Sequence, residues 1–92
     1  MVTAVVLIKA ATDKVPELAQ TLADLEGVSE VFSVAGQYDL VALVRVRANE
    51  DLAHVISEKM RKLPGITSSE TLIAFKVYSK QDIEAAFQLG LD

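Results

Sequence analysis

The side chains that suggest ligand chemistry gather in one short segment, Ala35-Gly36-Gln37-Tyr38-Asp39-Leu40. Gly36 permits the positive φ of a tight turn, and Tyr38 and Asp39 place an aromatic ring and a carboxylate directly before an apolar run. One interpretation makes Asp39 a hairpin cap that accepts backbone N–H groups. The other makes it the acceptor for a ligand ammonium, with Tyr38 as a wall and free turn amides for a ligand carboxylate. The residues leave both interpretations open.

A second polar segment, Thr67-Ser68-Ser69-Glu70-Thr71, stands out in a chain that is 51% hydrophobic. Hydroxyl groups at this density suit hydrogen bonding to a ligand. They suit the solvated side of an edge strand equally well.

Catalytic and metal-binding patterns are missing from the sequence. The chain has no cysteine and one histidine, His54, which lies beside the apolar stripe of an expected helix. No second nitrogen or sulfur ligand accompanies it. We find no Gly-x-Ser-x-Gly and no Gly-x-Gly-x-x-Gly, and four glycines leave no phosphate-cradling loop. We therefore expect no enzyme activity, no metal and no cofactor.

The charge balance argues against direct nucleic-acid binding. The chain has nine basic and 13 acidic residues, which gives a net charge of −4. An acidic chain is repelled by the phosphates of nucleic acids. Lys9 interrupts the longest early apolar run, so no stretch reaches the roughly 18 residues of a membrane span. The first ten residues lack the basic region and cleavage site of a signal peptide. We expect a cytoplasmic protein without a membrane partner.

An internal repeat with an offset of 38 residues organises the chain. Each half contains, in order, an expected strand, a turn, a helix, the motif Leu-x-Gly followed by an apolar residue, and a second strand. The identities pair Val6, Ala10, Asp13, Leu25 and Gly27 with Val44, Ala48, Asp51, Leu63 and Gly65.

The periodicity predicts four strands and three helices. Thr12 and Asp13 suit a helix start, Pro16 suits its first turn, and Gly27 suits the position just after its end. Asn49 is a good cap for the second helix. The expected strands are 2–10, 28–34, 39–47 and 66–78. The first expected helix follows the cap at Thr12 or Asp13 and ends at Gly27, the second follows the cap at Asn49 and ends at Pro64-Gly65, and the third spans 81–89.

This order is β-α-β-β-α-β with a tail helix, which predicts an α+β, ferredoxin-like fold. We expect one domain over residues 1–79. Residues 80–92 then form a helical tail that packs on the domain or on a partner subunit.

Both faces of the expected sheet are apolar. The third strand carries Leu40, Ala42, Val44 and Val46 in one register and Val41 and Leu43 in the other. Helices on one face would leave an apolar patch larger than monomers tolerate. A tail helix of nine residues is too short to cover four strands. The sequence therefore predicts a second copy packed sheet to sheet, a dimeric α/β barrel.

Two stretches together resemble a known family. They are VSEVFSVAGQYDL, with its Gly-x-Tyr-Asp turn, and LPGITSSETLIAFKV, with its Leu-Pro-Gly. Over residues 2–79 the chain resembles the effector domain of the Lrp/AsnC regulators, also called the RAM domain.

The resemblance implies a ferredoxin-like fold that dimerises through its sheets, with dimers assembling into tetramers, octamers or larger rings. It also implies an amino-acid effector bound where one dimer meets another. Carried over residue by residue, it points to Gly36, Gln37, Tyr38 and Asp39, followed by Thr67, Ser69 and Thr71.

The sequence departs from the family pattern in two places. The chain opens at the first strand without a helix-turn-helix segment, and Ala35 stands where the family often has threonine. We therefore expect a stand-alone amino-acid sensor that acts through partners, such as full-length Lrp/AsnC regulators. The alternatives are a small dimeric α/β-barrel enzyme of monooxygenase or isomerase type and a purely structural oligomerisation module.

Overall fold

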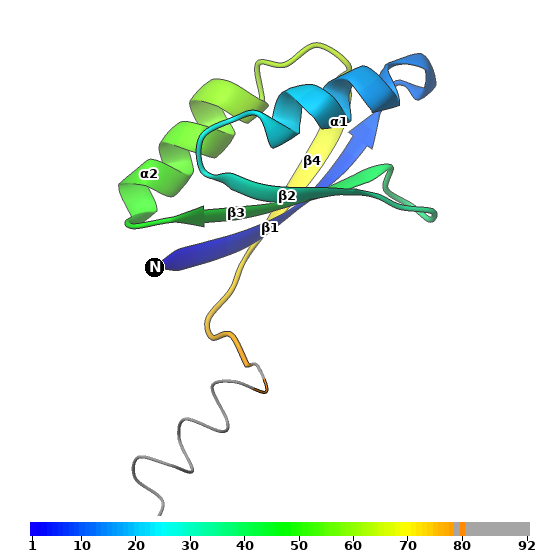
Figure 1. Cartoon of the computed structure of the whole chain (residues 1–92). Helices are drawn as coiled ribbons and strands as arrows, with labels where there is room; N and C mark the ends of the chain where they lie inside the picture. The colour runs from blue at the N-terminus through cyan, green and yellow to red at the C-terminus, as the bar shows by residue number, and fades with distance from the viewer. Residues whose placement is uncertain (79, 81–92) are drawn as a thin grey trace, which may run out of the picture.

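The computed structural model describes residues 1–78 and 80. Its elements follow the predicted strand and helix order (Figure 1). In chain order they are β1 (Val2–Ala10), η1 (Thr12–Lys14), α1 (Val15–Ala23), β2 (Val28–Ser33), β3 (Leu40–Val46), α2 (Asn49–Ala53), η2 (His54–Met60) and β4 (Ile66–Ile73).

The four strands form one antiparallel sheet in the order β2-β3-β1-β4. The two helices lie side by side on one face of this sheet (Figure 1). The central strands β1 and β3 come from different halves of the chain, so the two β-α-β halves interleave. The predicted ferredoxin-like α+β fold is confirmed.

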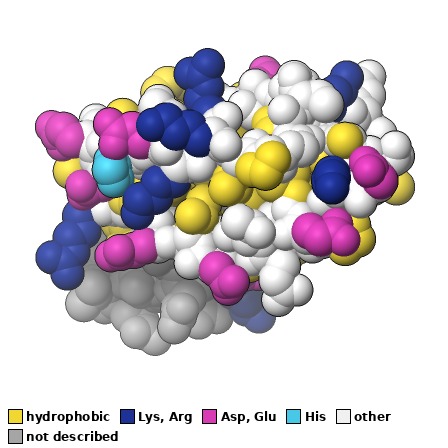
Figure 2. Space-filling view, turned by 90° about the horizontal axis from the view of Figure 1, so that it is seen from above, with side chains coloured by type: hydrophobic (Ala, Val, Ile, Leu, Met, Phe, Trp, Pro, Cys, Tyr) yellow, Lys and Arg dark blue, Asp and Glu magenta, His cyan; other side chains and the backbone are white. Residues whose placement is uncertain are grey.

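The core lies between the sheet and the helices. Successive strand residues face opposite sides, so alternate residues of β1 and β3 point toward the helices and are buried. From above, charged side chains of both signs surround the apolar ones on this helical face (Figure 2). The buried side chains are Ala4, Val6, Ile8, Ala10, Leu18, Leu22, Leu40, Ala42, Val44, Val46, Leu52, Val55 and Met60.

The face of the sheet away from the helices is apolar as well, and we call it the open face. At its centre Val5 pairs with Leu43, and Phe32 and Leu72 at its edges are 43% and 47% exposed. The prediction that both registers of the central strands are apolar is confirmed. The apolar side chains of the open face are Val5, Leu7, Phe32, Val41, Leu43 and Leu72.

The helix starts differ from those predicted. Thr12 and Asp13 form a short 3₁₀ turn, and no side chain caps it or α1. Asn49 is the first helical residue of α2, so Ala48 takes the capping position. Pro16 does lie in the first turn of α1, as predicted. No helix among the described residues is long and apolar enough to cross a membrane.

The second helix is wound more loosely after Ala53. Over η2 it is π-helical, and the Arg61 amide donates to the Ile56 carbonyl at 3.0 Å, five residues back. Val55 and Met60, also five residues apart, are both buried under this segment. The wider turn thus brings both side chains into the core.

The predicted fourth strand, 66–78, is too long. β4 ends at Ile73, and the Ala74 amide makes a last bond to the Thr3 carbonyl at 2.9 Å. Its neighbour β1 begins at Val2, so the following residues have no strand beside them to pair with. Phe75, for example, is fully exposed. The predicted helix 81–89 lies outside the described residues.

Two glycines related by the 38-residue offset share one conformation. Gly27 and Gly65 have φ values of +96° and +98°, where side chains other than hydrogen are disfavoured. Gly27 lies before β2 rather than directly after α1, which ends at Ala23. A Cβ atom on Gly27 would lie 2.9 Å from Val55 Cγ2.

We therefore expect Gly27→Ala to lower the free energy of unfolding by about 2 kcal/mol, from backbone strain and this contact together. Urea denaturation measures the loss. In a Val55→Ala background the same substitution is expected to cost less, because the contact is gone while the strain remains. An equal loss of unfolding free energy in the two backgrounds would show that Val55 does not crowd a side chain at position 27.

Candidate functional site

The turn between β2 and β3 is closed by a hydrogen bond from the Val34 amide to the Asp39 carbonyl, at 3.1 Å. Gly36 has a φ of +143°, and open space surrounds the position where a Cβ atom would lie. The backbone conformation alone, rather than crowding, therefore favours glycine there. Gly36 and its neighbour Gln37 are exposed at the tip of the turn.

Asp39 ties this turn to the central strand β1. Its amide donates to the Ile8 carbonyl at 2.9 Å, and its Oδ2 accepts a hydrogen bond from the Ala10 amide at 2.8 Å. The second carboxylate oxygen, Oδ1, has no hydrogen-bond partner within the described part of the chain. One oxygen thus acts as the predicted cap, and the other remains available to a ligand.

A bulge explains why β1 needs this cap. Ala10 pairs with Ile66 and Lys9 with Ser68, so Thr67 is the extra residue in β4. The Thr67 hydroxyl donates to the Lys9 carbonyl at 3.0 Å. Thr67 and Asp39 therefore bond to backbone groups on either side of the irregular pairing.

Tyr38 links the turn to the middle of β4. Its hydroxyl donates to Glu70 Oε2 at 2.7 Å, and Lys9 Nζ lies 5.8 Å from its ring centroid. This hydrogen bond to Glu70, and secondarily desolvation and the charge of Glu70, raises the pKa of Tyr38 above its usual value. The phenol is therefore a donor at neutral pH. We call the group Lys9, Gly36, Gln37, Tyr38, Asp39, Thr67 and Glu70 the turn site.

Ser69 and Thr71 occupy a different surface. They pair with Ile8 and Val6, so they belong to the helical side of β4, whereas Glu70 pairs with Leu7 on the open face. There they line a groove of about 490 Å³ beside Arg61 and Ile56 of the second helix.

The structure thus brings five of the seven predicted site residues to the turn site. Ser69 and Thr71 lie apart from Gly36 to Asp39, and Thr67 lines their groove as well. Lys9, Glu70 and Arg61 were missed as site residues. Glu70 lies inside the polar segment 67–71, and Arg61 lies in a basic cluster with Lys59 and Lys62. No sequence pattern indicates that Glu70 contacts Tyr38 or that Arg61 lines the groove.

The single histidine does not join the turn site. His54 Nδ1 lies 2.6 Å from Glu58 Oε2, one helical turn away, and both side chains are more than half exposed. Among residues 1–78 and 80, no group of three or more potential ligands could hold a metal ion.

Comparison with known proteins places this geometry in a family. The model of the Lrp/AsnC ligand binding domain matches residues 3–83. A protein of Pyrococcus furiosus named as an uncharacterized HTH-type transcriptional regulator is 34% identical over 67 residues, which cover 73% of this chain and 44% of that protein. The chain spans about half the length of the curated relatives it matches.

Solved structures show the same fold. TTHA0845 from Thermus thermophilus is 44% identical with a TM-score of 0.82, covering 87% of this chain and all of that one. A transcriptional regulator of Neisseria meningitidis, solved as a complex with L-Met, has a TM-score of 0.75. It is 14% identical, with 85% of this chain and 52% of that one covered, so this likeness concerns the fold alone. Because the family model matches nearly the whole described region, the chain belongs to the Lrp/AsnC family through its ligand-binding domain.

Proposed function

We propose that this chain is an amino-acid-sensing effector domain. It binds a small amino acid or a related metabolite at the turn site, where one dimer meets another, and it modulates transcription or amino-acid metabolism through partner proteins in the cytoplasm. The observation that carries the proposal is Asp39, which holds the turn to β1 with one carboxylate oxygen and leaves the other without a partner among the described residues.

The turn site offers a partner for each charged group of an amino acid. The Asp39 Oδ1 accepts the ligand ammonium, and the amides of Gly36 and Gln37 donate to its carboxylate. Tyr38 forms a wall beside the ligand. Thr67 lies near the start of β4 and supplies a hydroxyl. Ser69 and Thr71 act from the groove on the helical side of β4.

The family and the named Neisseria complex support an amino acid as the effector class. The family model is that of a ligand-binding domain, and the complex shows L-Met bound to a protein of the same fold. Neither identifies which amino acid this chain binds.

The open face supplies the surface for dimerisation. Six apolar side chains, centred on Val5 and Leu43, would otherwise meet water. A second copy packed sheet to sheet buries them and leaves the turn sites at the ends of the strands. Dimers then join into tetramers, octamers or larger rings, and an effector between dimers stabilises one assembly over another.

The partners of this assembly are proteins rather than DNA. The net charge of −4 disfavours contact with phosphate. Relatives are named as HTH-type transcriptional regulators, and mixed assembly with such regulators would couple the bound effector to transcription. The regulator names of the relatives likewise support a role other than catalysis.

Substitution of Leu43 tests the dimer. We expect the wild-type chain to scatter light as a dimer or a larger species, and Leu43→Glu to shift it toward monomer, because a charge enters the centre of the open face. Gln20→Glu, which adds the same charge on the exposed side of α1, is the control and keeps the assembly. A folded wild-type monomer at micromolar concentration would refute the sheet-to-sheet dimer.

Substitution of Asp39 tests the site. A thermal-shift screen with the twenty amino acids selects the effector, and calorimetric titration then measures its affinity. We expect Asp39→Asn to weaken binding roughly 30- to 150-fold, the equivalent of about 2–3 kcal/mol for a lost charged partner. Its melting temperature stays near that of the wild type, because the amide oxygen still accepts from Ala10.

Asp39→Ala separates the two roles of this residue. It removes the cap and the charge together, so we expect it to lose affinity and also to melt at a lower temperature. If Asp39→Asn binds the selected amino acid as tightly as the wild type, Asp39 is only a cap. If no amino acid raises the melting temperature, the chain is not a sensor of this class.

A further inference from the structure

Two charged side chains of the turn site have no part in the ligand contacts proposed above. Lys9 Nζ lies 5.8 Å from the ring centroid of Tyr38, and Glu70 Oε2 accepts the Tyr38 hydroxyl at 2.7 Å. Both Lys9 and Glu70 are exposed. Glu70 belongs to the edge strand β4, so its carboxylate lies at the rim of the sheet rather than at its centre. Both charges are therefore open to a ligand held by the turn.

The turn site contains three charges that do not pair with one another. They are the carboxylates of Asp39 and Glu70 and the ammonium of Lys9. Within the described residues, the one ion pair closer than 4.0 Å joins His54 to Glu58. In the same part of the chain, Asp39 Oδ1 and Glu70 Oε1 have no hydrogen-bond partner. The site thus has a net charge of −1, with one oxygen of each carboxylate available.

This net charge distinguishes between classes of amino acid. The α-ammonium and the α-carboxylate of any amino acid cancel, so only the side chain of the ligand can neutralise the site. An acidic side chain would add a third carboxylate, and an apolar one would leave the charge of Glu70 unmatched. A basic side chain supplies the missing positive charge. The two cations and one anion of a basic amino acid complement the two carboxylates and one ammonium of the site.

Tyr38 connects the two carboxylates of the site. It directly precedes Asp39 in the chain, and its hydroxyl, at the far end of the side chain, contacts Glu70. A ligand whose α-ammonium binds Asp39 can therefore lay its methylene groups along the Tyr38 ring and place a second cation at Glu70. Apolar contact with the ring and a cation near the ring face both stabilise such a ligand.

We infer that the effector is a basic amino acid, such as lysine or arginine, and that Glu70 selects it. The α-ammonium binds Asp39 Oδ1, the α-carboxylate binds the turn amides and Lys9, and the side-chain cation binds Glu70 Oε1. This inference rests on the proposed function and narrows the class of its effector.

Norleucine tests the contact with Glu70, because it is lysine without the terminal ammonium. In calorimetric titrations of the full chain, we expect lysine to bind about tenfold or more tightly than norleucine, since only lysine makes the charge-assisted contact. We expect glutamate to bind more weakly than norleucine, because its side chain is repelled by Glu70.

Charge-matched variants locate this selectivity. Glu70→Gln removes the charge and keeps an oxygen that accepts from Tyr38, so we expect it to lower the affinity for lysine to that for norleucine and to leave norleucine unchanged. Lys9→Gln is expected to weaken both ligands, because both carry the α-carboxylate. Glu17→Gln removes the same charge as Glu70→Gln from an exposed position on α1, and is the control that keeps the preference for lysine.

Two results would overturn the inference and leave the sensor standing. One is norleucine or glutamate binding at least as tightly as lysine and arginine. The other is a preference for lysine over norleucine that survives in Glu70→Gln. A chain that binds none of the twenty amino acids would overturn the proposed function together with this inference.

Discussion

The central strands β1 and β3 carry apolar side chains on both faces of the sheet, and the rest of the structure follows from this constraint. The helices cover one face and bury Ile8, Leu22, Leu40 and Met60 there. Residues 1–78 and 80 provide no second layer for the other face. These residues therefore cover only one face of the sheet, and the proposed function is that of an assembling domain.

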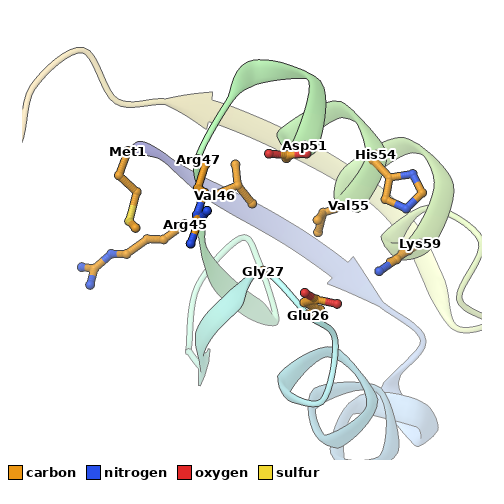
Figure 3. A pocket seen from close by; sticks show the side chains of 10 residues that line it. All are labelled: Met1, Glu26, Gly27, Arg45, Val46, Arg47, Asp51, His54, Val55 and Lys59. Carbon is orange, nitrogen blue, oxygen red and sulfur yellow. The ribbon is translucent and has the colours of Figure 1, made fainter.

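The same constraint decides where polar chemistry is placed. With both faces apolar, the hydrogen-bonding groups concentrate at the two ends of β3 and along the edge strand β4. At one end, Asp39 and Thr67 bond to backbone groups beside a bulge. At the other, charged side chains of both signs line a pocket beside Gly27 (Figure 3). The proposed sheet-to-sheet dimer uses the open face rather than these two ends of the strands.

Much of the fold could be predicted from the sequence, because β1, α1 and β3 follow simple periods of apolar residues. The β-α-β-β-α-β order of the elements predicts the ferredoxin-like fold as well. Features set by tertiary contacts could not be predicted. β4 stops where β1 no longer pairs with it, and the second helix becomes π-helical over η2.

The candidate site, too, could be predicted only where its residues follow a local pattern. Gly36, Tyr38 and Asp39 are recognisable in sequence because a turn requires such residues. The contact of Tyr38 with Glu70 joins residues 32 positions apart, and no local pattern signals it. The pocket beside Gly27 collects charged side chains from three separate segments, so it becomes visible only in the folded chain (Figure 3).

The central claim is that effector binding and assembly are one linked equilibrium. Sedimentation velocity of the wild-type chain, with and without the amino acid that most raises its melting temperature, tests this claim most directly. The account predicts a dimer or larger species without ligand and a different distribution of assemblies at saturating ligand, because an effector between dimers must favour one assembly. An unchanged distribution, while calorimetry shows the ligand fully bound, would contradict it.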